Sequence, residues 1–167
     1  MNMNNQHSIR PMFLIGFLLC LGMTAVALYA QYVMYLEPCP LCIFQRVAVM
    51  AIGLICLLGA LHNPSTSFGR RAYGQLVIIA ALVGGAIAAR HIWLQHLPPE
   101  KVPACGPGLS YWLDTMPFTS VLSKVFEGSG ECAEVVLRTF GLSIPEWTFI
   151  AFAVFALYGL KVLIKGR

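Results

Sequence analysis

Long blocks of hydrophobic residues alternate with short polar stretches along the chain. Four blocks are each about 20 residues long, and at about 1.5 Å per residue such a helix crosses a hydrocarbon core of roughly 30 Å. A capping box, Ser143-Ile-Pro-Glu146, marks the start of the last block. The pattern predicts an all-α membrane protein, a four-transmembrane-helix bundle in a single domain (residues 1–167), with spans at about residues 12–34, 43–61, 73–94 and 145–164.

A shorter amphipathic pattern follows the third span. After Pro117, apolar residues recur at helical spacing with polar residues between them: Phe118, Val121, Leu122, Val125 and Phe126. This periodicity predicts a short amphipathic helix. Because bulky apolar residues also precede it, we expect an interfacial helix that lies flat on the membrane surface, in the second outer loop.

Composition and charge support a membrane protein and give it an orientation. The chain is 58% hydrophobic and only 11% charged, whereas a soluble domain carries roughly 25% charged residues. Six basic residues lie at the chain ends and between the second and third spans: Arg10, Arg70, Arg71, Lys161, Lys165 and Arg167. All seven acidic residues lie on the opposite side: Glu37, Glu100, Asp114, Glu127, Glu131, Glu134 and Glu146.

This asymmetry predicts cytoplasmic termini and extracytoplasmic loops at about residues 35–42 and 95–144, because positive residues favour the cytoplasmic side. The first block is longer than the roughly 7 to 15 residues of a signal-peptide core, so we expect it to remain as a span. The net charge of +4 then reflects anchoring in the lipid bilayer, and we predict no nucleic-acid partner.

Four of the six cysteines fall in the predicted outer loops, where disulfides persist: Cys39, Cys42, Cys105 and Cys132. They allow three pairings, between which their spacing does not decide. Cys39-Pro-Leu-Cys42 would close a very short loop, so its cross-link adds little stability and suits electron exchange. Cys42 is predicted at the N-terminus of the second span, where the helix dipole favours a thiolate. Cys20 and Cys56 lie inside spans and are expected to pack as small apolar residues.

Two polar residues lie near the outer ends of spans. Arg46 follows Cys42 by four residues, so both lie on one helix face, and His91 lies at a similar depth in the third span. An ionisable residue inside a span marks a functional site by default, which predicts that Arg46 and His91 contact a lipid-soluble acceptor. The alternatives are an Arg46 side chain that only reaches the interface and a purely structural His91.

The second outer loop places its two cysteines differently. A glycine-containing turn ends the amphipathic helix and leads directly to Cys132, which we therefore expect near the membrane and near Cys39. Pro103 and the glycine-rich run at residues 106–108 predict a mobile, exposed strip for Cys105.

Together these features resemble the DsbB family, the bacterial disulfide bond formation proteins. The resemblance covers nearly the whole chain and rests on the order of five motifs: Cys39-Pro-Leu-Cys42 followed by Ile-Phe-Gln-Arg46, His91 before Ile-Trp-Leu-Gln, the pair Cys105 and Cys132, Ser129-Gly-Glu-Cys-Ala-Glu134, and Gly141-Leu-Ser-Ile-Pro-Glu-Trp147. Family members often carry an acid just before the arginine. Here Gln45 takes that place, which leaves the proton source open.

The resemblance implies a protein-disulfide:quinone oxidoreductase of the bacterial inner membrane. It would reoxidise a DsbA-like periplasmic thioredoxin-fold protein and pass the electrons to a membrane quinone, either ubiquinone or menaquinone. Arg46 and His91 would bind the quinone, and no metal is implied.

The resemblance also implies roles for the four outer cysteines. The reduced partner would attack Cys105 of a Cys105–Cys132 disulfide, and the freed Cys132 would pair with Cys39. Cys42 would then remain as the thiolate that faces the quinone. The resting pairing is either Cys39–Cys42 with Cys105–Cys132, or an interloop Cys39–Cys132 bond.

Three alternatives stay open at this level. The four outer cysteines could form an all-thiolate zinc site in a membrane adaptor. The chain could be a four-helix scaffold or transporter whose disulfides brace its loops. A quinone-linked reductase of the vitamin K type would share the four-span organisation.

Overall fold

The structure, a computed structural model, describes residues 9–106, 109–135 and 137–165. Two sequence features named above lie outside these ranges: Arg167 and residues 107–108 of the glycine-rich run.

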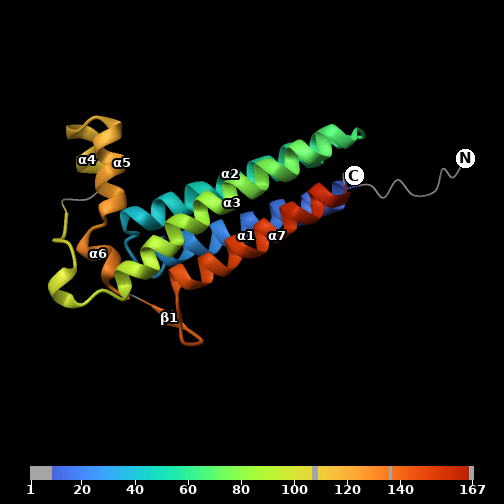
Figure 1. Cartoon of the computed structure of the whole chain (residues 1–167). Coiled ribbons are helices and arrows are strands. Elements are labelled where there is room, and N and C mark those ends of the chain that lie inside the picture. The colour runs from blue at the N-terminus through green and yellow to red at the C-terminus, as the bar shows by residue number, and fades with distance from the viewer. Residues whose placement is uncertain (1–8, 107–108, 136, 166–167) are drawn as a thin grey trace, which may run out of the picture.

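Four long helices run side by side as a bundle (Figure 1): α1 (Arg10–Tyr32), α2 (Pro40–His62), α3 (Ser67–Gln95) and α7 (Ile144–Lys165). Helix α3 packs against both α7 and α2, and α1 packs against α2. All four are long and apolar enough to cross a membrane. The predicted all-α, four-helix membrane fold is therefore confirmed.

All four long helices begin earlier than their apolar blocks do, and the difference is largest for α2 and α3. Helix α2 begins at Pro40 rather than at residue 43, and α3 begins at Ser67 rather than at residue 73. The Cys39 sulfur and the Thr66 hydroxyl each accept a backbone N–H of the turn that follows, so each residue acts as an N-cap. Hydropathy does not detect these first turns, because a cap is a local hydrogen bond and because Arg70 and Arg71 interrupt the apolar run at the start of α3.

The Glu146 half of the predicted capping box is present at the start of α7. The Glu146 carboxylate accepts hydrogen bonds from the Ser143 backbone N–H at 2.6 Å and from the Ser143 hydroxyl at 2.9 Å. A short antiparallel hairpin, β1 (Arg138–Thr139) with β2 (Leu142–Ser143), leads directly into this helix.

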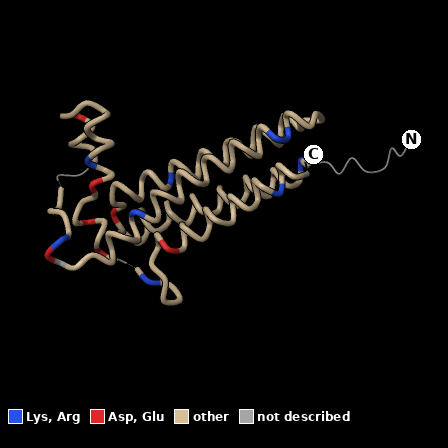
Figure 2. Tube along the Cα trace, in the orientation of Figure 1, with Lys and Arg blue, Asp and Glu red and all other residues tan. Residues whose placement is uncertain are grey.

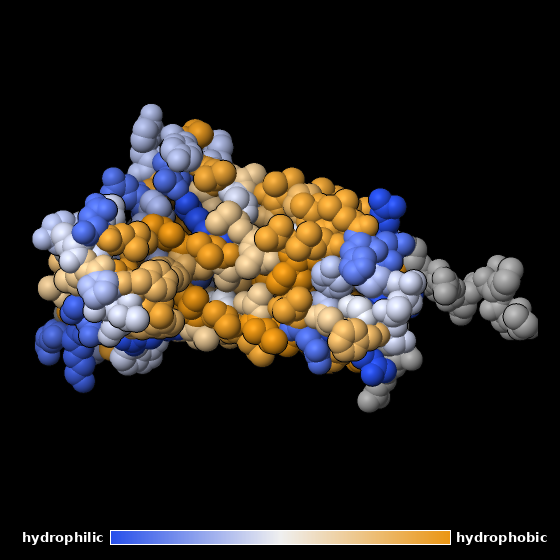
Figure 3. All heavy atoms as spheres, turned by 90° about the horizontal axis from the view of Figure 1, so that it is seen from above, coloured by the Kyte–Doolittle hydropathy of each residue, from blue (hydrophilic) through white to orange (hydrophobic). Residues whose placement is uncertain are grey.

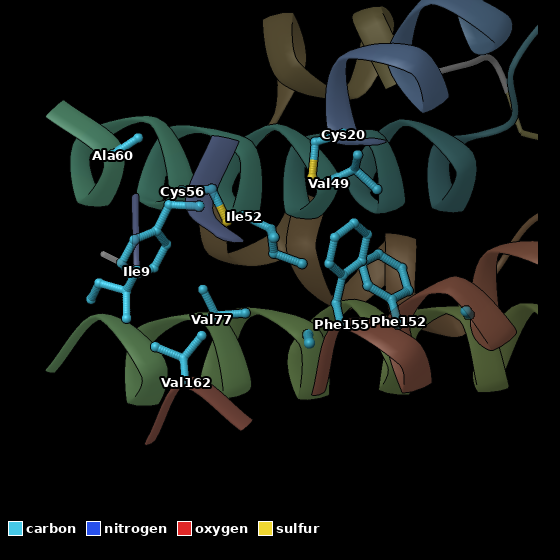
Figure 4. Packing of buried hydrophobic residues seen from close by; sticks show 13 residues of the cluster. Ile9, Cys20, Val49, Ile52, Cys56, Ala60, Val77, Phe152, Phe155 and Val162 are labelled. Atoms are coloured by element: carbon cyan, nitrogen blue, oxygen red, sulfur yellow. The ribbon is translucent and has the colours of Figure 1, made fainter. Parts of the chain in front are cut away.

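A core of apolar side chains fills the space between the long helices (Figure 4). Ile52 of α2, Val77 of α3 and Phe152 of α7 are each at most 1% exposed. Gly84 of α3 lies against the Phe152 ring, and a Cβ atom at this position would overlap the ring. Small residues in α3 therefore let α7 approach closely, which is how helices associate inside a membrane.

The outward faces of the bundle are apolar as well. Ile15, Leu54, Leu82 and Leu157, one on each long helix, are all more than half exposed, at 56%, 56%, 61% and 68%. Figure 3 shows this hydrophobic surface as a band between two hydrophilic ends. Among the described residues, the end where α2 leads into α3 carries basic residues only, while acidic residues gather at the opposite end, which we name the outer end after its predicted side (Figure 2).

The chain between α3 and α7 covers the outer end of the bundle with four short helices (Figure 1): η1 (Pro99–Lys101), α4 (Leu109–Thr115), α5 (Phe118–Glu127) and α6 (Gly130–Ala133). Trp112 of α4, Val121 of α5 and Cys132 of α6 form a second buried cluster with Leu41 of α2 and Leu94 of α3. The outer loop is therefore packed onto the bundle.

Helix α5 has the bounds expected from its amphipathic pattern. Val121 and Val125 are buried, whereas Phe118 and Phe126 remain 65% and 45% exposed. The Arg90 guanidinium of α3 donates to the carbonyls of Phe126 and Glu127 at the end of α5, at 3.0 and 3.1 Å. Only part of the apolar stripe is used in packing, and the membrane-surface position of α5 stays a prediction.

Candidate functional site

Cys39 and Cys42 lie at the outer start of α2, where the cap brings their sulfurs together. Cys39 is the N-cap residue, and Pro40 is in the first turn. Proline suits this position because it has no backbone N–H, and an N–H in the first turn would have no partner within the helix. The Cys42 backbone N–H donates to the Cys39 Sγ at 3.4 Å, and the two sulfurs lie 3.0 Å apart. The two thiols are therefore adjacent, and the Cys39 sulfur also accepts a backbone hydrogen bond.

Cys132 of α6 meets this pair from the second outer loop. One ligand atom from each of Cys39, His91 and Cys132 lies within 4.8 Å of the other two, and all three residues are buried. The expected proximity of Cys132 and Cys39 is thus present in the structure. A hydrogen bond with the Cys39 side chain, followed by burial, raises the pKa of the Cys132 thiol well above its usual value.

Cys105 differs from the other three outer cysteines because it is exposed. It lies beside α6, where the Gly130 backbone N–H donates to the Ala104 carbonyl at 3.4 Å. A Cβ atom at Gly130 would come within 2.9 Å of the Cys105 Sγ, so only glycine leaves room for this thiol. An open groove of about 510 Å³, bordered by Leu97 and Glu134, runs along the same segment.

His91 of α3 lies behind the sulfurs and is only 2% exposed. Its Nε2 is 3.8 Å from the Cys39 Sγ, and its Nδ1 is 4.0 Å from the Cys42 Sγ. The shortest contact of the ring is with Gln45, whose Nε2 lies 3.0 Å from His91 Nδ1. The described contacts of His91 are thus with sulfur, with an amide and with the backbone of Cys132.

Gln45 was noticed in the sequence only as a replacement for an acid, and its contact with His91 was missed. It is 4% exposed and faces α3. The sequence does contain a signal for this contact: Gln45 is an amide inside an apolar span, and a buried amide requires a hydrogen-bond partner.

Arg46 points toward α1. Its guanidinium donates to the Gln31 side-chain oxygen and, at 3.1 Å, to the Ala27 carbonyl. The residue is only half-buried, and its neighbours Val47 and Met50 are 52% and 50% exposed. Arg46 and Gln45 thus bind opposite neighbours of α2. The expected contact of Arg46 and His91 with one shared acceptor stays a prediction.

The remaining cysteines are part of the bundle core, as expected. Cys20 of α1 and Cys56 of α2 are 2% and 0% exposed. Their side chains pack against Gly53 and Gly16 on the opposing helix. All six cysteines are free thiols in the structure.

The cluster of Cys39, His91 and Cys132 bears on the alternative zinc site. Two thiols and an imidazole are ligands that zinc accepts, but they differ from the all-thiolate set considered above. Cys105 is exposed and is not in this cluster. The same convergence suits thiol–disulfide exchange, which needs one sulfur to reach another.

Comparison with known proteins identifies the family. The family described as DsbB, disulfide bond formation protein DsbB, matches residues 9–162. A disulfide bond formation protein B of Chromohalobacter salexigens is 51% identical over 156 residues, covering 93% of this chain and 91% of the relative. A protein of the same name from Nitrosococcus oceani is 54% identical over 145 residues, covering 87% and 85%. The chain therefore belongs to the DsbB family of disulfide bond formation proteins, and is an oxidoreductase of disulfide formation.

Proposed function

We propose that this protein reoxidises a DsbA-like periplasmic thioredoxin-fold dithiol protein and passes the electrons through two cysteine pairs to a membrane quinone. The activity is that of a protein-disulfide:quinone oxidoreductase. The observation that carries the proposal is the convergence of Cys39 and Cys132, from different outer loops, beside Cys42 and with Cys105 exposed nearby.

The proposed electron path starts at the exposed thiol. A thiolate of the reduced partner attacks Cys105 of a Cys105–Cys132 disulfide, forms a mixed disulfide, and leaves the electron pair of the broken bond on Cys132. Cys132 then attacks Cys39 of the Cys39–Cys42 disulfide, which forms an interloop bond and leaves Cys42 as the thiolate. The short distances around Cys39 support this second exchange.

The partner is then released through the same cysteines. The second thiolate of the partner attacks the mixed disulfide and frees Cys105. Cys105 attacks Cys132 of the interloop bond, which restores the outer pair and leaves the electron pair on Cys39. Two electrons have then moved from the partner to Cys39 and Cys42.

A quinone fits the surroundings of Cys42. Cys42 and Arg46 are both half-buried and lie one turn apart on α2, and the exposed apolar residues Val47 and Met50 follow Arg46 on the same helix. A molecule dissolved in lipid would therefore have access to them. When bound, the quinone supplies a two-electron acceptor, and Arg46 would hold it by hydrogen bonds and by its charge.

Redox potentials favour such an acceptor over a soluble thiol. The dithiol/disulfide couple of a DsbA-like protein has a reduction potential of about −120 mV, above the about −180 to −300 mV of glutathione pools. Oxidised glutathione therefore cannot return the partner to its disulfide form. A quinone avoids this limit when its reduction potential lies above that of the partner.

The proposed function also implies where in the cell the protein lies. The protein is a multi-pass protein of the bacterial inner membrane, with cytoplasmic termini and with its redox loops in the periplasm. The basic residues at one end of the bundle and the acidic residues at the other support this orientation.

The test is turnover by the purified chain. We expect the native protein in detergent, mixed with a reduced DsbA-like protein and a soluble quinone analogue, to bleach the quinone absorbance catalytically. Cys42→Ser should abolish turnover, because Cys42 is the thiol next to the quinone. Cys56→Ala, which changes a buried cysteine of the bundle core, is the matched control and should keep it. Absence of turnover by the native protein would refute the proposal.

A further inference from the structure

Two nitrogen atoms of the protein lie near the Cys39 sulfur. The Cys42 backbone N–H lies 3.4 Å from it, and His91 Nε2 lies 3.8 Å from it on the other helix. Cys39, Gln45 and His91 are 7%, 4% and 2% exposed, so water does not replace these contacts. In such a site, a negative charge on Cys39 depends on the donors that the protein provides.

Whether His91 is a donor depends on which ring nitrogen carries the proton. In a neutral imidazole one nitrogen donates and the other accepts. An amide Nε2 carries hydrogens and can only donate. Gln45 Nε2 is 3.0 Å from His91 Nδ1, and with the amide in this orientation Nδ1 accepts and the proton sits on Nε2, the nitrogen beside Cys39.

We propose that Gln45 is a positioning residue that holds His91 in its Nε2–H tautomer, so that His91 and the Cys42 amide together stabilise Cys39 as a leaving thiolate. This inference rests on the proposed function, because it concerns the step in which Cys39 leaves a disulfide. Gln45 does not touch the reacting atoms and acts through the imidazole.

The step balances without a proton transfer. As Cys105 attacks the interloop bond, a Cys105–Cys132 bond forms, the Cys132–Cys39 bond breaks, and its electron pair stays on Cys39. The Nε2 proton remains on His91 and donates a hydrogen bond to the new thiolate. With the opposite tautomer, a nitrogen lone pair would face that thiolate and oppose its formation.

The tautomer can be measured directly by ¹⁵N NMR of the full chain in detergent, with labelled histidine and with His91→Asn to assign the signal. We expect His91 in the native protein to carry its proton on Nε2. Gln45→Leu should give a mixture of tautomers, and Gln45→Glu should move the proton to Nδ1, because a carboxylate accepts rather than donates. Gln31→Leu, which removes the amide on the opposite side of α2, is the matched control and should leave the spectrum unchanged.

The kinetic consequence is tested on Cys39 alone. In a chain with Cys42, Cys105 and Cys132 replaced by serine, we expect Gln45→Leu to slow alkylation of Cys39 at neutral pH on the order of tenfold, the lower range for a hydrogen bond to a charged group. The pH midpoint of the reaction should move upward. In a His91→Leu background, Gln45→Leu should have no further effect.

These experiments use neither partner nor quinone, so they can fail while turnover succeeds. A proton on Nδ1 in the native protein, or a tautomer that Gln45→Leu does not change, would overturn the inference. Equal effects of Gln45→Leu with and without His91 would also overturn it.

Discussion

At the scale of single residues, Gln45 and Arg46 are adjacent in the sequence but contact different helices. Gln45 bonds a histidine of α3, whereas Arg46 bonds α1 through Gln31 and a backbone carbonyl. The sequence predicted that Arg46 is functional because a cation in a span is costly. It did not predict these partners, because the partners of a buried polar residue are set by the packing of helices distant in sequence.

The role of Arg46 predicts a defect specific to the quinone. Arg46→Met should raise the KM for quinone about tenfold, because a charged hydrogen-bonding group is lost. Arg46→Lys should have an intermediate effect, since an ammonium keeps the charge but lacks the planar fork. Steady-state kinetics with varied quinone measure both. Disulfide exchange with the partner in a single turnover serves as the control, and an unchanged KM for quinone would contradict this role.

The outer cysteines should also differ in reactivity. Because the pKa of Cys132 is raised, its thiol stays protonated at neutral pH and becomes reactive only as the pH rises toward that elevated value. Cys105 is exposed and should be alkylated before Cys132. Mass spectrometry of the reduced chain after brief iodoacetamide treatment, over a range of pH, measures the order. Faster labelling of Cys132 at neutral pH would contradict it.

At the scale of elements, hydropathy predicts the four long helices but not the short elements that connect α3 to α7. The apolar blocks predicted α1, α2, α3 and α7, and periodicity predicted α5. The short helices η1, α4 and α6 and the β1–β2 hairpin were not predicted. Each is too short to show a period, and their shape depends on packing such as that of Trp112 over the end of the bundle.

The contact between α3 and α7 gives a test of packing. Gly84→Ala should destabilise the bundle by about 1–3 kcal/mol, because its methyl group would overlap the Phe152 ring in a filled core. Gly85→Ala is the matched control: its methyl group would lie 3.7 Å from the Phe152 Cβ, an ordinary contact. Thermal unfolding in detergent, followed by circular dichroism, compares the two. Equal stabilities would contradict the close approach.

At the scale of the whole molecule, the charge asymmetry that predicted the orientation separates the two ends of the bundle. A membrane-impermeant maleimide should label Cys105 in reduced, intact spheroplasts, because this thiol is exposed at the outer end. Ser65→Cys, in the exposed turn between α2 and α3, should react only after the membrane is opened. Labelling at position 65 in intact spheroplasts, measured in a chain that also carries Cys105→Ser, would reverse the proposed orientation.

The burial of Cys39 and Cys132 limits where electrons can enter and leave the protein. Cys105 is open to water and Cys42 is half-buried beside the lipid-facing surface, while Cys39 and Cys132 between them are 7% and 0% exposed. Among these four cysteines, small thiols dissolved around the protein thus reach only Cys105. In the proposed relay the packed outer loop insulates Cys39 and Cys132, so electrons enter at Cys105 and cannot short-circuit at the two buried sulfurs.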